Sequence, residues 1–177
     1  VLQTVLDVLL GCPLDGIVVV LGHNEDAVRG DLGGQPVTIC RNPFPDRGMF
    51  SSVLCGLGVL PDGTSAALFV LGDQPWIRAD VVQGVVEAYR RTGKGIIVPV
   101  HNGRRGHPTL IDLDRYGDAI RDLDGDSGLK PLVRGYPGDT LEVPVSEKGI
   151  LTDLDTPDDY RRALEELNAS EDTDHSV

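Results

Sequence analysis

The chain has 177 residues, of which 40% are apolar and 25% are charged, and its formal net charge is -12. This length and composition fit one globular domain with a sizeable core. The acidic balance argues against non-specific binding to nucleic acid or to an anionic membrane, because both need a basic surface. It does not exclude a phosphorylated small substrate, whose binding depends on local charge.

The cysteines Cys12, Cys40 and Cys55 are isolated in the sequence, and their spacing matches neither a zinc site nor a disulfide framework. Their apolar neighbours suggest reduced thiols, so we expect a cytoplasmic protein. No segment is long and apolar enough to span a membrane, and the N-terminus lacks the features of a signal peptide. We expect one domain over residues 1–168 and a disordered polar tail over 169–177.

The hydrophobic pattern predicts helices and strands that alternate through the first two-thirds of the chain. The expected strands are Ile17–Leu21, Val37–Cys40, Ala66–Val70, Gly95–Val100, Thr109–Ile111 and Thr140–Val145, with a short strand or turn at Ile150–Asp155. The expected helices are Val1–Leu10, Asn24–Leu32, Val53–Leu60, Ala79–Arg91, Leu113–Leu123, a segment from about Gly125 to Arg134, and Thr156–Leu167. Such alternation is typical of an α/β fold with a mainly parallel sheet, in which Thr140–Val145 would be an edge strand.

The stretch Ala66–Pro75 carries the first candidate for chemistry. Apolar residues run unbroken from Ala66 to Val70, as in a central strand that is buried on both faces. Asp73 follows the carboxyl end of this strand, where open α/β sheets bind their ligands, and a carboxylate there is suited to Mg²⁺ and phosphate. An Asp that begins a turn or caps the next helix is the simpler alternative, and this stretch alone favours it.

A second acidic segment lies near the end of the chain. Asp153 and Asp155 flank Leu154, so they point the same way if the segment is extended. Either carboxylate could meet Asp73 across a Mg²⁺ ion, with phosphate oxygens and water as the remaining ligands. The alternative is an acidic cap before the helix at Thr156, and these residues alone give the two interpretations equal weight.

Two further loops also follow predicted strands. Ser51 and Ser52 end the first loop, which spans residues 42–52, and they lie at the first turn of a helix, whose N–H groups favour an anion. Simple N-capping by serine is the alternative. The second loop spans residues 101–108, and we expect it to be mobile. Arg104 and Arg105 make it locally basic, although its last residues also suit an ordinary turn into a strand.

In this order, the four loops resemble the molybdenum cofactor cytidylyltransferase branch of the MobA-like nucleotidyltransferases. The resemblance covers essentially residues 1–165, and it implies a Rossmann-like three-layer α/β/α fold with a mostly parallel sheet and a small antiparallel edge. The matching stretches are Asn42-Pro43 with Gly48 to Val53, Leu71-Gly72-Asp73-Gln74-Pro75, Val98-Pro99 with Gly103 and Gly106-His107-Pro108, and Asp153-Leu154-Asp155-Thr156-Pro157-Asp158-Asp159-Tyr160.

The resemblance implies an enzyme that transfers CMP from CTP to a molybdopterin-type molybdenum cofactor and releases pyrophosphate. By position, Asp73 would be the first Mg²⁺ ligand and Asp155 the second, with Asp153 behind it. The resemblance also implies a nucleotide pocket and an acceptor-facing loop. The pocket residues would be Asn42, Gly48, Ser51, Ser52 and Gly72, and the acceptor-facing residues Arg104, Arg105, Gly106, His107 and Pro108.

Two other functions remain open. The same fold could use GTP, or could transfer a nucleotide to a different phosphorylated acceptor. The chain could instead be a non-catalytic accessory that binds the cofactor and serves a molybdenum hydroxylase or its maturation factor. Some relatives of the family are described as oxidoreductases, but the sequence has no Gly-x-Gly-x-x-Gly turn for a dinucleotide.

The sequence departs from the family at its start. The family begins with a strand and a loop of the form Leu-Ala-Ala-Gly-x-Ser-x-Arg-Met-Gly, followed by a Lys, and that loop cradles the triphosphate. Nothing here matches it, because Val1–Leu10 corresponds to the helix that follows the loop. We therefore expect either a truncated chain, which the lack of an initial Met favours, or a degenerate member. We expect weak activity and marginal stability in both cases.

Overall fold

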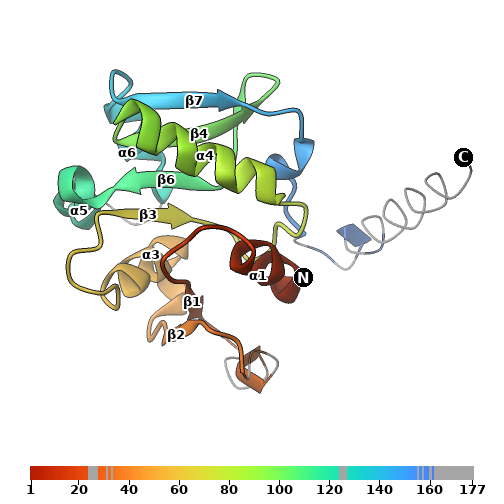
Figure 1. Cartoon of the computed structure of the whole chain (residues 1–177). Helices are drawn as coiled ribbons and strands as arrows, with labels where there is room; N and C mark the ends of the chain where they lie inside the picture. The colour runs from red at the N-terminus through yellow and green to blue at the C-terminus, as the bar shows by residue number, and fades with distance from the viewer. Residues whose placement is uncertain are drawn as a thin grey trace, which may run out of the picture.

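The computed structural model describes residues 1–23, 28–30, 32, 34–123, 127–154, 156, 158–159 and 161. These residues form two β-sheets covered by helices (Figure 1). In the first sheet, β1 (Val18–Leu21) pairs in parallel with β2 (Thr38–Arg41). The second sheet has the order β3-β6-β4-β5, and β7 pairs with the other edge of β4.

The expected α/β class is confirmed, and most predicted elements lie within a few residues of their expected positions. The strands of the second sheet are β3 (Ala66–Phe69), β4 (Ile96–His101), β5 (Arg104–Arg105), β6 (Thr109–Asp112) and β7 (Thr140–Pro144). The helices and 3-10 turns are α1 (Leu2–Leu10), η1 (Pro45–Arg47), α3 (Met49–Leu57), α4 (Ala79–Thr92), α5 (Leu113–Arg121), α6 (Lys130–Gly135) and η3 (Lys148–Leu151).

Some predictions fall on residues outside the described part of the chain. These include much of the helix expected at Asn24–Leu32, nearly all of the helix expected at Thr156–Leu167, and the tail 169–177. At the start of that last helix, Thr156 acts as an N-cap. Its hydroxyl accepts a hydrogen bond from the Asp159 N–H at 3.1 Å, and its own N–H donates to the Asp159 carboxylate at 3.0 Å.

The pairing in the second sheet is more mixed than the expected mostly parallel arrangement. Strands β3, β4 and β7 point the same way, but β6 runs against β3 and β4, and β5 runs against β4. One antiparallel pair arises from a tight hairpin between β4 and β5. Asn102 and Gly103 form its turn with positive φ angles of 50° and 75°, as in a two-residue type I′ turn. The loop expected to be mobile is therefore partly a hairpin.

Strand β3 lies at an edge of its sheet, so the predicted central position of Ala66–Val70 is wrong. Among the described strands it pairs with β6 alone, and its residues are half-buried. Both of its faces are nevertheless covered, because Phe69 packs against the cluster of Phe50 and Leu68 packs against that of Val5. Its unbroken apolar run therefore reflects two covered faces rather than two flanking strands.

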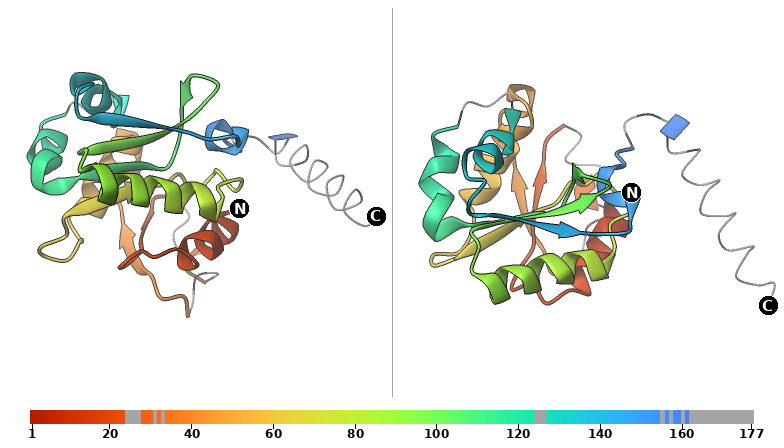
Figure 2. Two further views of the ribbon diagram at one scale, coloured as in Figure 1. Left: turned by 45° about the horizontal axis from the view of Figure 1, so that its top comes forward. Right: turned by 90° about the horizontal axis from the view of Figure 1, so that it is seen from above.

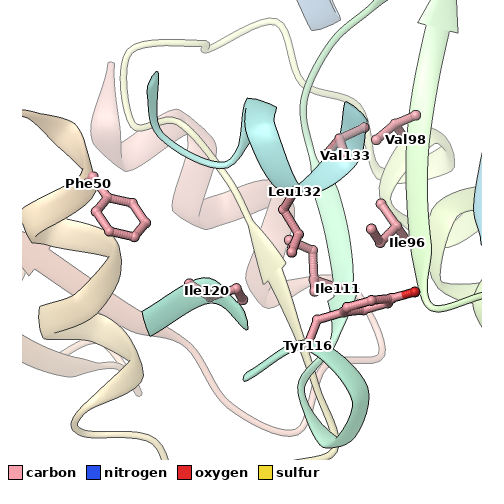
Figure 3. Packing of buried hydrophobic residues seen from close by; sticks show 8 residues of the cluster. All are labelled: Phe50, Ile96, Val98, Ile111, Tyr116, Ile120, Leu132 and Val133. Carbon is pink, nitrogen blue, oxygen red and sulfur yellow. The ribbon is translucent and has the colours of Figure 1, made fainter. Parts of the chain in front are cut away.

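The helices form layers on both faces of the second sheet. Figure 2 shows α4 on one face and α5 and α6 on the other. The side chains on the α5 and α6 face make the core cluster drawn in Figure 3, and Val85 and Val86 of α4 cover Ile97 and Leu110 on the opposite face. The predicted three-layer arrangement is thus present. The residues in Figure 3 are Phe50, Ile96, Val98, Ile111, Tyr116, Ile120, Leu132 and Val133.

Helix α1 joins the two sheets. Its residues Val5 and Leu9 belong to the cluster that contacts β3, whereas Leu6 packs with Val19 and Leu21 of β1. This amphipathic helix was predicted from its apolar spacing. No helix in the described part of the chain has the length and apolar character needed to cross a bilayer.

The described cysteines are free thiols, but two of them are not isolated in space. The Sγ atoms of Cys40 in β2 and Cys55 in α3 lie 2.6 Å apart. Burial, followed by the hydrogen bond with Cys55, raises the pKa of the Cys40 thiol to about 11. Cys40 is therefore protonated at neutral pH.

Candidate active site

The loop that follows β2 is closed by one buried side chain. Asn42 is 3% exposed, and its amide nitrogen donates hydrogen bonds to the hydroxyls of Ser51 at 2.7 Å and Ser52 at 3.0 Å. Its amide oxygen accepts a hydrogen bond from the Phe44 N–H at 2.9 Å. Residues 42–52, which we name the serine loop, are thus tied together by Asn42.

The serine loop leads directly into helix α3. Gly48 precedes the helix with a φ of 81°, a conformation that glycine adopts without strain. No side chain caps α3, and the Ser51 hydroxyl lies 2.8 Å from the carbonyl oxygen of Gly48. The alternative of N-capping by serine is therefore wrong, while the expected position of both serines in the first turn is confirmed.

A second group of predicted residues gathers where β3 ends. Asp73 comes from the turn after β3, His107 from the segment before β6, and Asp153 from the segment after η3. The Leu154 N–H donates to the backbone carbonyl of Asp73 at 3.0 Å, and both carboxylates act electrostatically on the His107 ring. Together with Gln74, these three residues form what we name the aspartate junction.

The half-buried ring of His107 is held in its neutral form. Burial is the largest effect and lowers the pKa of His107, although the hydrogen bond to the Phe69 carbonyl and the charges of Asp153 and Asp73 act in the opposite direction. Its Nδ1 atom lies 3.4 Å from that carbonyl oxygen, which can only accept. The hydrogen of the neutral ring is thus on Nδ1, and Nε2 presents a lone pair.

Sequence reasoning missed Gln74 as a site residue. Its side chain is 3% exposed, and its amide nitrogen donates a hydrogen bond of 2.5 Å to Oδ1 of Asp153. A glutamine after an aspartate carries no strong signal by itself. The signal that could have identified it is its position in the family-matching stretch Leu71-Gly72-Asp73-Gln74-Pro75.

Both predicted arginines lie on β5, and a lysine that was not predicted acts on His107. Arg104 and Arg105 are exposed on β5, and Nε of Arg105 forms an ion pair with Glu142 of β7 at 2.8 Å. Lys130, at the start of α6, is the cation that lowers the pKa of His107. Sequence reasoning missed this lysine because nothing in its local pattern separates it from a solvated surface residue.

Two further predicted site residues are glycines. Gly72 is exposed beside Asp73, and a β-carbon there would lie 3.3 Å from the side chain of Leu2. A β-carbon on Gly106 would lie 2.3 Å from the carbonyl oxygen of Ile150. Gly106 thus allows a close approach of two backbones. Pro108 is buried next to it, after a cis peptide bond.

The donor atoms of the junction suit a hard divalent cation. Asp73 and Asp153 offer the carboxylate oxygens that Mg²⁺ and Mn²⁺ prefer, and Oδ1 of Asp73 is buried. The described residues include no group of three or more His, Cys, Asp or Glu that could hold a metal by themselves. Asp155, the preferred second ligand, lies outside the described residues. The arrangement therefore fits an ion held jointly with phosphate oxygens and water.

The chain belongs to the MobA-like NTP transferase domain family, whose profile matches residues 1–141. It is 27% identical over 150 residues to the molybdenum cofactor cytidylyltransferase of Escherichia coli strain K12, covering 84% of this chain and 74% of that protein. It is 28% identical over 153 residues to the nicotine blue oxidoreductase of Paenarthrobacter nicotinovorans, with the same two shares.

A solved structure with the same fold contains a divalent metal. The crystal structure of Rv0371c from Mycobacterium tuberculosis H37Rv in complex with manganese matches with a TM-score of 0.79 and 26% identity, covering 93% of this chain and 85% of that one. These comparisons confirm the predicted nucleotidyltransferase family and its Rossmann-like fold class.

Proposed function

We propose that this protein transfers CMP from CTP to a molybdopterin-type molybdenum cofactor and releases pyrophosphate. The observation that carries the proposal is the convergence of Asp73, His107 and Asp153 at one end of the sheet, in a chain of a nucleotidyltransferase family. The identity to the Escherichia coli cytidylyltransferase supports CTP as the nucleotide. Free thiols favour the cytoplasm as its location.

Asp73 and Asp153 would hold the Mg²⁺ ion, with Asp155 as a further ligand. When bound, the ion would neutralise charge on the α-phosphate and favour the departure of pyrophosphate. Two carboxylates, phosphate oxygens and water make an ordinary Mg²⁺ site. The manganese complex of the Mycobacterium tuberculosis protein supports a divalent cation as the cofactor of this chain.

The serine loop would receive the nucleotide. Both amide hydrogens of Asn42 are already engaged by Ser51 and Ser52, so Asn42 would shape the loop rather than contact the base. The N-terminal turn of α3 after Gly48 has no side-chain cap and would favour a phosphate oxygen. Gly72, exposed beside Asp73, would let the phosphates approach the backbone.

The acceptor would bind on the His107 side of the junction. Its terminal phosphate is already anionic, so it would attack the α-phosphorus without a protein base while the bond to pyrophosphate breaks. Lys130 and Arg104 would neutralise the acceptor's charge, and Arg105 would do so if it left Glu142. Neutral His107 would accept a hydrogen bond at Nε2, beside the wall formed by Gly106 and Pro108.

Pyrophosphate release from CTP and from GTP, with the molybdenum cofactor as acceptor, tests this proposal. We expect CTP to be the better substrate and Asp73→Ala to lower turnover by about 100-fold or more, because the metal would lose a ligand. Faster release from GTP would replace cytidylyl by guanylyl transfer. Wild-type turnover in Asp73→Ala would show that the metal assignment is wrong.

Assays on the same wild-type and variant proteins distinguish two other functions. An accessory protein for a molybdenum hydroxylase would bind the cofactor without turning over either nucleotide, and Asp73→Ala would keep that binding. The identity to nicotine blue oxidoreductase favours a redox function as the second candidate. Reduction of nicotine blue by this chain, without nucleotidyl transfer, would support it.

A further inference from the structure

The segment after β7 joins the two loops of the aspartate junction. In Figure 1 it follows the β7 arrow down across the end of the second sheet. The carbonyl of Ile150, a residue 1% exposed, accepts a hydrogen bond from the His107 N–H at 3.1 Å. The Leu154 N–H reaches the carbonyl of Asp73 at 3.0 Å. Residues 148–154, which we name the clasp, thus contact both loops.

Two glycines allow the clasp to lie this close. A β-carbon on Gly149 would lie 2.6 Å from Cβ of Trp76, and one on Gly106 would lie 2.3 Å from the Ile150 carbonyl oxygen. Neither glycine has a positive φ, so the absence of a side chain, rather than an unusual backbone conformation, is what these positions require. The clasp is therefore held by close contacts with Trp76 in the Asp73 turn and with Gly106 in the His107 loop.

Gln74 adds a side-chain contact between the Asp73 turn and the clasp. It is buried, whereas the Asp153 side chain is exposed, and the two residues are 79 positions apart in the chain. We propose that Gln74 is a positioning residue, which holds the Asp153 carboxylate beside Asp73 so that both can take one divalent cation. The inference rests on the proposed function.

The chemistry of the amide suits this role. An exposed carboxylate can adopt several rotamers, and a donor fixed in the protein selects one of them, as partners of metal ligands commonly do. A lysine or arginine would also fix Asp153, but its positive charge would oppose the cation. Glutamine donates a hydrogen bond without adding charge, so Asp153 keeps its full negative charge for the metal.

Mn²⁺ binding, measured by the electron paramagnetic resonance signal of the free ion in the presence of CTP, tests the inference without any need for turnover. Gln74→Met has nearly the same length and cannot donate, and we expect it to bind Mn²⁺ roughly tenfold more weakly. Gln83→Met on the exposed face of α4 is the matched control and should bind as the wild type does. Thermal melts would establish that each variant is folded.

A double substitution distinguishes whether Gln74 positions Asp153 or stabilises the site in a general way. Because Gln74 acts through Asp153, Gln74→Met with Asp153→Ala should bind Mn²⁺ no more weakly, within about twofold, than Asp153→Ala alone. Should Gln74→Met fail to fold, Gln74→Asn, whose amide is one methylene too short, carries the same expectation. Additive losses in the double variant, or wild-type affinity in a folded Gln74 variant, would overturn the inference alone. A wild-type protein that binds no Mn²⁺ with CTP would overturn the proposed metal site as well.

Discussion

The serine loop and the aspartate junction are held together in different ways. One buried side chain, Asn42, closes the serine loop through partners at most ten positions away. The junction is assembled from distant segments, and the bond between Gln74 and Asp153 joins residues 79 positions apart. A change in the serine loop should therefore loosen one local element, whereas a change in the junction should separate two elements that must act together.

The largest effect on stability is expected where the clasp meets the acceptor loop. Gly106→Ala would place a β-carbon against the Ile150 carbonyl, so the backbone must move, and we expect a loss of about 3 kcal/mol in the free energy of unfolding. Gly84→Ala in α4 is the control, because its β-carbon meets nothing within 4 Å and should stabilise the helix by about 0.5 kcal/mol. Urea denaturation measures both, and equal stabilities for the two variants would contradict the close contact between Gly106 and the Ile150 carbonyl.

A smaller and more local effect is expected in the serine loop. Asn42→Ala would remove the donors to both hydroxyls and the acceptor of the Phe44 N–H, which should cost about 2 kcal/mol. Because the same loop would receive the nucleotide, the KM for CTP should rise. Asn42→Asp, which keeps the acceptor but cannot donate, should behave in the same way. An unchanged KM for CTP in both variants would show that the serine loop does not bind the nucleotide.

The smallest effect is a pH dependence at His107. Burial lowers its pKa from the ordinary value of 6.5, so the unfolded chain binds the proton more tightly than the folded one. The contribution is fully present above pH 6.5 and is lost as the pH falls from there through the folded pKa. The stability of wild type relative to His107→Gln should therefore decrease below about pH 6.5. A constant difference between pH 7.5 and 5 would show that folding does not lower the pKa of His107.

The sequence predicted the parts of each region but not how they are joined. Asp73 and the serines were candidates from local patterns, because they follow a strand or begin a helix, whereas His107 was assigned by the resemblance to the family. Gln74 and Lys130 were missed because their significance depends on Asp153 and His107, which only the fold brings near. The edge position of β3 was missed for the same reason, since apolar runs report covered faces and not neighbouring strands.

In the proposed site, the Asp73 turn and the clasp together hold one cation with the nucleotide. Anomalous diffraction at the manganese edge, from crystals grown with Mn²⁺ and CTP, tests it most directly. We predict one manganese peak about 2.1 Å from carboxylate oxygens of both Asp73 and Asp153, next to the phosphates of CTP. A bound CTP with no manganese at these carboxylates, or with manganese elsewhere, would contradict the claim.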